Sequence, residues 1–184
     1  MTQNELLDHL EAEIRQTLET LRREIVPLSD EALHFRSTQN QWTIAECCAH
    51  LNVFFERYLP RIEAAIHKAK ARKWQADHHA AVRYAMFAKG AIRKVHPGNQ
   101  KKYRTGKKYD FYAQPLNRTA LKVFIIHLER LARTVAQARE TDINRASVQR
   151  GQSTFLRYTL GNVFEWLTLH SQRHLAQILS AIPK

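Results

Sequence analysis

Apolar residues recur every three or four positions along four long stretches of this chain, the period that places them on one face of an α-helix. The pattern predicts helices over about residues 4–26, 44–69, 116–140 and 154–182. Possible capping boxes begin the first two, and Pro27 ends the first. The inward stripes of the first three are Leu6, Leu10, Ile14, Leu18, Leu21 and Ile25; Cys47, Leu51, Phe54, Tyr58, Ile62 and Ile66; and Leu121, Phe124, Leu128, Leu131 and Val135.

Four amphipathic helices of this length bury their stripes most simply as a four-helix bundle. About 45 residues separate the second helix from the third, enough for a crossover that lets these two helices run parallel. A further helix is predicted over 77–95, before Pro97-Gly98. We therefore expect an all-α fold, with one domain over residues 1–184 and a basic crossover insertion over about 70–114.

Two histidines near the carboxyl end are the strongest chemical signal. His170 and His174 are four residues apart and share one helix face. The stripe of Leu156, Leu160, Val163 and Leu167 continues onto both, so they are expected to point inward. A buried imidazole without partners costs about 1–3 kcal/mol. Either metal coordination or a hydrogen-bond network would remove that cost, and the pair alone does not decide between them.

A third ligand could come from the second helix. Thr43 and Glu46 form a capping box that marks its start, and His50 follows on the same face as Cys47 and Phe54. Cys47 could itself ligate zinc, although a buried apolar role is favoured. His127 could be a fourth ligand, although a place on the surface or flank of its helix is favoured. The three tryptophans are interpreted as core and helix-start residues.

One family shares these motifs. The segment Asn40-Gln41-Trp42-Thr43-Ile44-Ala45-Glu46 leading to His50-Leu51, with His170-x-x-x-His174-Leu175-x-Gln177-Ile178, resembles the DinB-like (YfiT-like) superfamily, whose members are regarded as metal-dependent enzymes. The resemblance implies a four-helix bundle with a divalent metal, commonly zinc or nickel, on His50, His170 and His174. Several relatives are thiol S-transferases that use bacillithiol or mycothiol, and others are suspected hydrolases or isomerases. It also implies a small-molecule substrate and a homodimer.

Three neutral imidazoles leave coordination positions open for a water or a thiol, either of which could then act as a nucleophile. The expected activity is transfer of a bacillithiol-type thiol to an electrophilic small molecule, with metal-dependent hydrolysis as the alternative. Gln177, Glu46 and Cys47 are candidate second-layer or substrate contacts, although Glu46 is expected to be committed to its cap. No general base is evident.

Charge supplies a rival hypothesis from another class. The formal net charge is +12, and the basic excess lies almost entirely within residues 70–118. The segment 99–112 interleaves cations with tyrosines, a mixture that can neutralise phosphates and stack on bases. Candidate anion or nucleic-acid contacts are Lys101, Lys102, Arg104, Lys107 and Lys108. The same cations could instead attract an anionic substrate or thiol to the metal. Contact of residues 82–95 with anionic lipid is a weaker alternative.

The expected cellular location is inferred from the membrane-spanning, signal and cysteine patterns of the sequence. No apolar run approaches the roughly 20 residues that span a membrane, and the first residues do not form a signal segment. Cys47 and Cys48 are adjacent, so an ordinary disulfide between them is not expected. Free thiols are typical of a reducing cytoplasm, which is the expected location.

Overall fold

Four long helices form the body of the protein in a computed structural model that describes residues 1–39, 41–101, 103–151, 153 and 155–183. They are α1 (Gln3–Thr20, continued by the π-helical turn η1, Leu21–Ile25), α3 (Ile44–Ala71), α5 (Thr119–Ala138) and α6 (Leu160–Ser180). Shorter elements are α2 (Asp30–His34), α4 (Ala88–Val95), the 3₁₀ turn η2 (Lys107–Tyr109) and the strands β1 (Ser147–Gln149) and β2 (Arg157–Thr159). The all-α prediction is confirmed.

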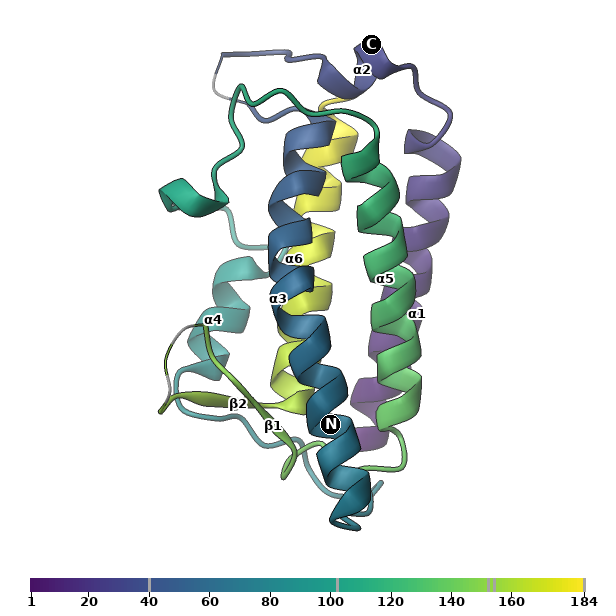
Figure 1. Ribbon diagram of the computed structural model, residues 1–184, viewed down its shortest axis with the longest axis vertical. Helices are drawn as coiled ribbons and strands as arrows, with labels where there is room; N and C mark the ends of the chain where they lie inside the picture. The colour runs from purple at the N-terminus through teal and green to yellow at the C-terminus, as the bar shows by residue number, and fades with distance from the viewer. Residues whose placement is uncertain (40, 102, 152, 154, 184) are drawn as a thin grey trace.

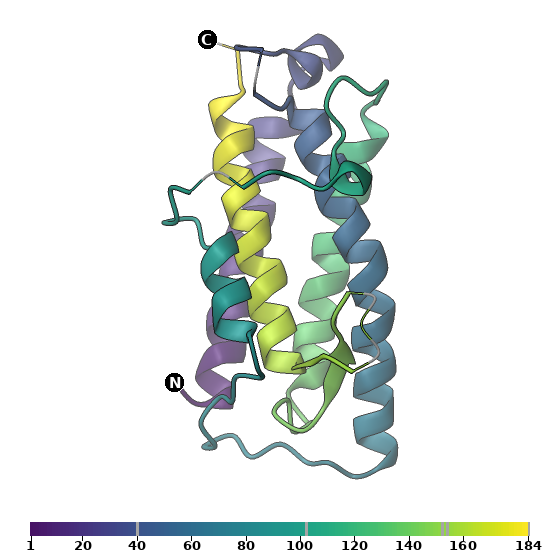
Figure 2. The same ribbon diagram turned by 90° about the vertical axis from the view of Figure 1, so that its left-hand side faces the viewer.

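The four helices pack as a square in which α3 contacts α5 and α6, and α1 contacts the same two. Figure 1 shows α3 and α5 running in one direction and α1 and α6 in the other. The long crossover makes this order possible, because it returns the chain to the end of the bundle at which α3 began (Figure 2). On its way it lays α4 against α6. The carboxyl-terminal half of α6 is thereby enclosed between α3 and the crossover, and this is where the candidate site lies.

The apolar stripes form the core as the periodicity predicts. Nearly every stripe residue is buried, with Leu6, Ile14 and Leu131 fully so. Both capping boxes are present, at Thr2 with Glu5 and at Thr43 with Glu46. Phe54 is an exception, since it is only partly buried and turns toward the cavity described below.

The predicted crossover helix is much shorter than expected, because α4 covers only Ala88–Val95. The preceding segment makes its backbone hydrogen bonds elsewhere: the Ala80 carbonyl accepts from the Gln3 amide, and the Ala85 amide donates to the Asn162 side chain. These partners anchor 80–85 along the starts of α1 and α6 in place of a helix. Phe87, with φ of 66°, then sets the left-handed turn into α4.

The last helix also starts later than predicted. Thr154 lies outside the described residues, and α6 begins at Leu160, with the Thr159 hydroxyl accepting from the Asn162 amide as its cap. Before it, β1 and β2 pair antiparallel, which the helical reading did not foresee. The third helix begins at Thr119 instead of near Leu116. Among the described residues, no helix is both long and apolar enough to cross a bilayer.

Candidate metal centre

Three histidines meet between α3 and α6. The Nε2 atom of His170 lies 3.4 Å from Nε2 of His50 and 3.1 Å from Nε2 of His174, and the ligand nitrogens of the three all lie within 4.8 Å of one another. Nitrogens bound about 2.1 Å from a tetrahedral zinc are about 3.4 Å apart. The spacing therefore fits three ligands of one cation.

A backbone carbonyl from the crossover sets the tautomer of His50. Its Nδ1 lies 2.8 Å from the carbonyl oxygen of Tyr109, which can only accept, so Nδ1 carries the proton and Nε2 keeps its lone pair. Tyr109 is held in turn by α3: its ring stacks on Phe54 with centroids 4.7 Å apart, and its hydroxyl accepts from Arg57 at 2.6 Å. His50, Phe54 and Arg57 occupy one face of α3, so the helix that supplies the ligand also holds its orienting partner.

Burial keeps the three imidazoles neutral. Burial lowers the pKa of His50, and burial with the neighbouring histidines lowers the pKa of His170 well below its usual range. Burial, together with the repulsion that a protonated His50 would add, lowers the pKa of His174 to about 3. At neutral pH all three rings are therefore neutral, the form that binds a metal. The Nδ1 atoms of His170 and His174 are buried and have no hydrogen-bond partner among the described residues. Within the described residues, His50 is therefore the one histidine of the three whose Nδ1 is held by an acceptor, the Tyr109 carbonyl.

The histidines form one wall of a cavity of about 750 Å³. Aromatic side chains surround them: the Trp42 ring lies 4.9 Å from the His50 ring and the Trp166 ring 4.9 Å from the His170 ring, centroid to centroid. Phe54 and Tyr109 continue this wall, and Lys94, Arg104 and Arg173 add positive charge. The size suits a small molecule.

The family assignment agrees with this geometry. The family model described as the DinB superfamily matches residues 13–178, which include all three histidines. The chain belongs to the DinB superfamily. No curated protein and no solved structure matches it. The match shows the family, and the three-histidine cluster in the bundle is consistent with a family of metal-dependent enzymes.

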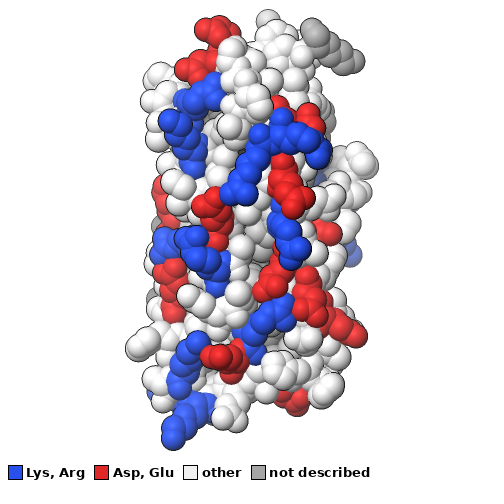
Figure 3. Space-filling model, turned by 90° about the vertical axis from the view of Figure 1, so that its right-hand side faces the viewer, with Lys and Arg blue, Asp and Glu red and all other residues white. Residues whose placement is uncertain are grey.

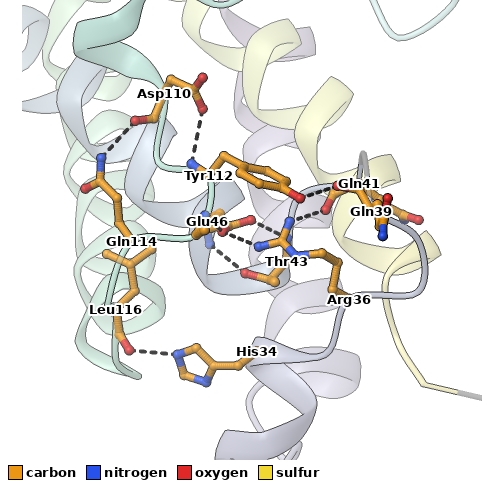
Figure 4. A network of polar contacts seen from close by, with 11 residues as sticks. His34, Arg36, Gln39, Gln41, Thr43, Glu46, Asp110, Tyr112, Gln114 and Leu116 are labelled. Atoms are coloured by element: carbon orange, nitrogen blue, oxygen red, sulfur yellow. Dashed lines mark hydrogen bonds and ion pairs between the residues drawn. The ribbon is translucent and has the colours of Figure 1, made fainter.

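Of the three further candidates in this DinB superfamily protein, only Gln177 lines the cavity. Glu46 lies in the network shown in Figure 4: its carboxylate accepts from the Thr43 amide at 2.8 Å, from Arg36 at 2.6 Å and from the Ala113 amide at 2.5 Å. It joins the start of α3 to the end of the crossover and is not free to meet a substrate. Cys47 is fully buried outside the cavity lining, and burial raises the pKa of its thiol to about 12.

His127 stands apart from the three-histidine cluster. It is buried on α5, where its ring pairs with the Asn52 side-chain oxygen at 3.2 Å and stacks on Phe55. The favoured place on the surface or flank of the helix is therefore wrong, because His127 is a hydrogen-bonded core residue. Burial lowers its pKa, so it is neutral as well.

The basic segment of the DinB protein only partly reaches the site. Arg104 lines the cavity, whereas Lys101, Lys107 and Lys108 are exposed outside its lining. Lys102 lies outside the described residues. Two tyrosines of the segment pack on protein: Tyr109 on Phe54, and Tyr112 against the Arg36 guanidinium, 4.1 Å from the ring centre. Nucleic-acid binding stays a prediction.

Sequence reasoning missed the aromatic and cationic wall. Trp42 and Trp166, interpreted as core residues, line the cavity beside the histidines. A signal for Trp166 was available, since it precedes His170 by one helical turn and so shares its face. Arg173 carried the same signal, since it follows His170 by three residues on α6, whereas Lys94 carried none, because its position depends on how the crossover folds.

Proposed function

We propose that His50, His170 and His174 hold one divalent cation, zinc or nickel, and that this DinB superfamily protein transfers a low-molecular-weight thiol of the bacillithiol type to an electrophilic small molecule. The observation that carries the proposal is the convergence of three neutral imidazole nitrogens on one point at the wall of a substrate-sized cavity. Imidazole ligands suit zinc and nickel, and three of them leave room for a further ligand. When bound, such a cation lowers the pKa of a thiol or a water beside it.

The cavity lining favours a thiol over water as the nucleophile. Among its described residues there is no Asp or Glu, the side chains that most often serve as general base beside a metal-bound water. Glu46, the nearest candidate in sequence, has all of its carboxylate engaged by Thr43, Arg36 and Ala113. A thiol has a pKa near about 8.5 before any assistance, so it needs no such base.

The thiol has to come from outside the protein. Cys47 and Cys48 are the two cysteines of the chain, and both are fully buried. Burial raises the pKa of Cys47 to about 12 and that of Cys48 well above its usual range. Neither can form a thiolate near neutral pH or reach the cavity. A soluble thiol is therefore the second substrate.

The reaction balances simply. The thiol loses its proton to solvent, its sulfur forms a bond to an electrophilic carbon, and a leaving group departs from that carbon with the bonding electron pair. The residues of the chain bind and orient: the aromatic wall of Trp42, Phe54 and Trp166 surrounds the reacting atoms and excludes water. Tyr109 keeps the Nε2 lone pair of His50 directed at the other two nitrogens.

The experiment supplies untagged, zinc- or nickel-loaded protein with chlorodinitrobenzene and a panel of thiols: bacillithiol, mycothiol, glutathione and cysteine. We expect metal-dependent loss of free thiol together with formation of the thioether. His174→Ala should abolish it, whereas His67→Ala, an exposed histidine of α3, should not. If no thiol is consumed and the protein instead hydrolyses ester or amide substrates in a metal-dependent way, the hydrolase alternative replaces this proposal.

A further inference from the structure

Positive side chains line the cavity, and Asp110, which follows Tyr109 in the sequence, acts on His50 by its charge from outside the described lining. Lys94 of α4, Arg104 of the crossover and Arg173 of α6 line it, and its described lining contains no Asp or Glu. The outer face of the bundle is different. In Figure 3, which views the α1 and α5 side, acidic and basic side chains are interspersed. Arg139, which follows α5, pairs with Asp8 and Glu11 of α1. Three cations without an acidic partner in the described lining therefore lie at the wall of the cavity beside the histidines.

Within the described residues, Arg173 is the cation of the three that is held by several backbone hydrogen bonds. Its guanidinium donates to the backbone carbonyls of His96, Asn99 and Lys101, at 3.2, 2.5 and 2.8 Å. These acceptors are neutral, and no described carboxylate forms an ion pair with Arg173, so its full charge remains at the cavity wall. It immediately precedes His174 in α6. A fixed cation thus lies beside the proposed metal ligands.

Beside the histidines the wall is built largely of flat aromatic rings. The rings of Phe54 and Tyr109 stack at 4.7 Å, and the Trp166 ring meets Phe54 edge-on at 5.4 Å. Trp42 lies parallel to the His174 ring at 6.1 Å. Aromatic faces of this kind contact a planar apolar body well, while the cations favour a negative charge on the same molecule.

We propose that the cavity binds an anionic small molecule with a planar apolar body, such as an aromatic carboxylate, its charge met by Arg173, Arg104 and Lys94. The inference rests on the proposed function in taking this molecule as the electrophilic reactant, since a thiol of the bacillithiol type has no planar apolar body. The charge preference itself is independent of the reaction, because it follows from cations that lie on the cavity wall whether or not thiol transfer occurs.

Binding calorimetry on the full-length protein tests it with three probes: naphthoate, its uncharged analogue naphthamide, and acetate. We expect naphthoate to bind at least about tenfold more tightly than either analogue. The advantage over naphthamide should shrink between about 50 and about 500 mM salt. Equal affinity for naphthoate and naphthamide would overturn the charge preference, and acetate binding as tightly as naphthoate would overturn the apolar body.

Substitution of single cations tests which residues cause the preference for naphthoate. Arg104→Gln and Lys94→Gln should each weaken naphthoate binding severalfold and leave naphthamide unchanged. Their controls are Lys107→Gln and Arg93→Gln, exposed neighbours outside the cavity lining, which should change neither. Arg173 is not substituted, because it also fixes the turn at 96–101. Equal losses in the variants and their controls would contradict the assignment.

Metal removal separates this inference from the proposed function. The preference for naphthoate should persist in chelator-treated protein, because the cations need no metal. If it vanishes on metal removal, the carboxylate binds the metal and the assignment to Arg104 and Lys94 is wrong. If the preference persists but no thiol panel member is consumed, the thiol-transfer proposal fails and this inference stands. Simultaneous binding of naphthoate and bacillithiol would support a separate site for the electrophile, and displacement of naphthoate by bacillithiol would contradict its assignment as the electrophile.

Discussion

The Nδ1 atom of His50 lies 2.8 Å from the carbonyl oxygen of Tyr109, which joins a bundle helix to a crossover segment 59 residues away in sequence. This hydrogen bond fixes which nitrogen of His50 faces His170. A histidine ligand whose other nitrogen is held in this way binds metal more tightly, because its orientation and tautomer are already set. The crossover is therefore part of the candidate metal centre.

Tyr109→Ala should weaken metal binding by about tenfold, because the ring that holds the carbonyl against His50 is removed. Tyr109→Phe loses only the hydroxyl that accepts from Arg57 and should have a smaller effect. Competition with a chromophoric chelator measures the affinity. Lys107→Ala, an exposed residue of the same crossover outside the cavity lining, is the control. Affinities that are the same in Tyr109→Ala and Lys107→Ala would remove Tyr109 from the centre.

The metal-free protein should lose stability as the pH falls below about 6.5. The pKa of His174 is lowered from 6.5 to about 3 in the fold, and that of His170 is lowered as well. Across this interval the unfolded chain binds protons that the folded chain excludes, so the free energy of unfolding rises with pH and falls on acidification. Each such histidine contributes at most about 1.4 kcal/mol per pH unit.

Urea unfolding between neutral pH and moderately acidic pH checks this dependence. His174→Leu should flatten it, because that residue no longer takes up a proton on unfolding. His67 is exposed, so His67→Ala should keep the wild-type dependence of the unfolding free energy on pH. A slope that is unchanged in His174→Leu would show that the buried histidine does not stay neutral in the fold.

Glu46 is expected to act on stability and not on chemistry. Its carboxylate is buried and accepts from three donors, including Arg36 and the Ala113 amide (Figure 4). Glu46→Ala should therefore lower the free energy of unfolding by about 2–4 kcal/mol, because buried donors are left without partners. Glu56→Ala, an exposed glutamate of the same helix, should change it little. A stable Glu46→Ala protein that had lost thiol transfer would instead place Glu46 in the reaction.

The helices and the histidine register were accessible from sequence because both depend on local periodicity. A stripe of Leu160, Val163 and Leu167 sets the phase of α6, and that phase carries His170 and His174 inward with it. His50 was accessible for the same reason, since the Thr43 capping box fixes where α3 begins. These signals need no knowledge of the tertiary fold.

The remainder depends on contacts between distant segments. The orienting partner of His50 is a backbone carbonyl, which any residue type could supply, so no side chain marks it in the sequence. Leu156 fits the periodicity of the last helix but lies before it, because its carbonyl accepts from the Arg150 amide. That hydrogen bond lies next to the hairpin of β1 and β2. Each of these strands has three residues, too few to show an alternating pattern. The homodimer and the cytoplasmic location stay predictions.

Metal content is the most direct test of the central claim. Untagged wild-type protein, exchanged into metal-free buffer after purification, should retain zinc or nickel at one ion per chain by mass spectrometry. His170→Ala, verified as folded by circular dichroism, should retain almost none, and His67→Ala should match the wild type. Full occupancy in His170→Ala, or no retained metal in the wild type even after incubation with zinc and nickel, would contradict the three-histidine centre.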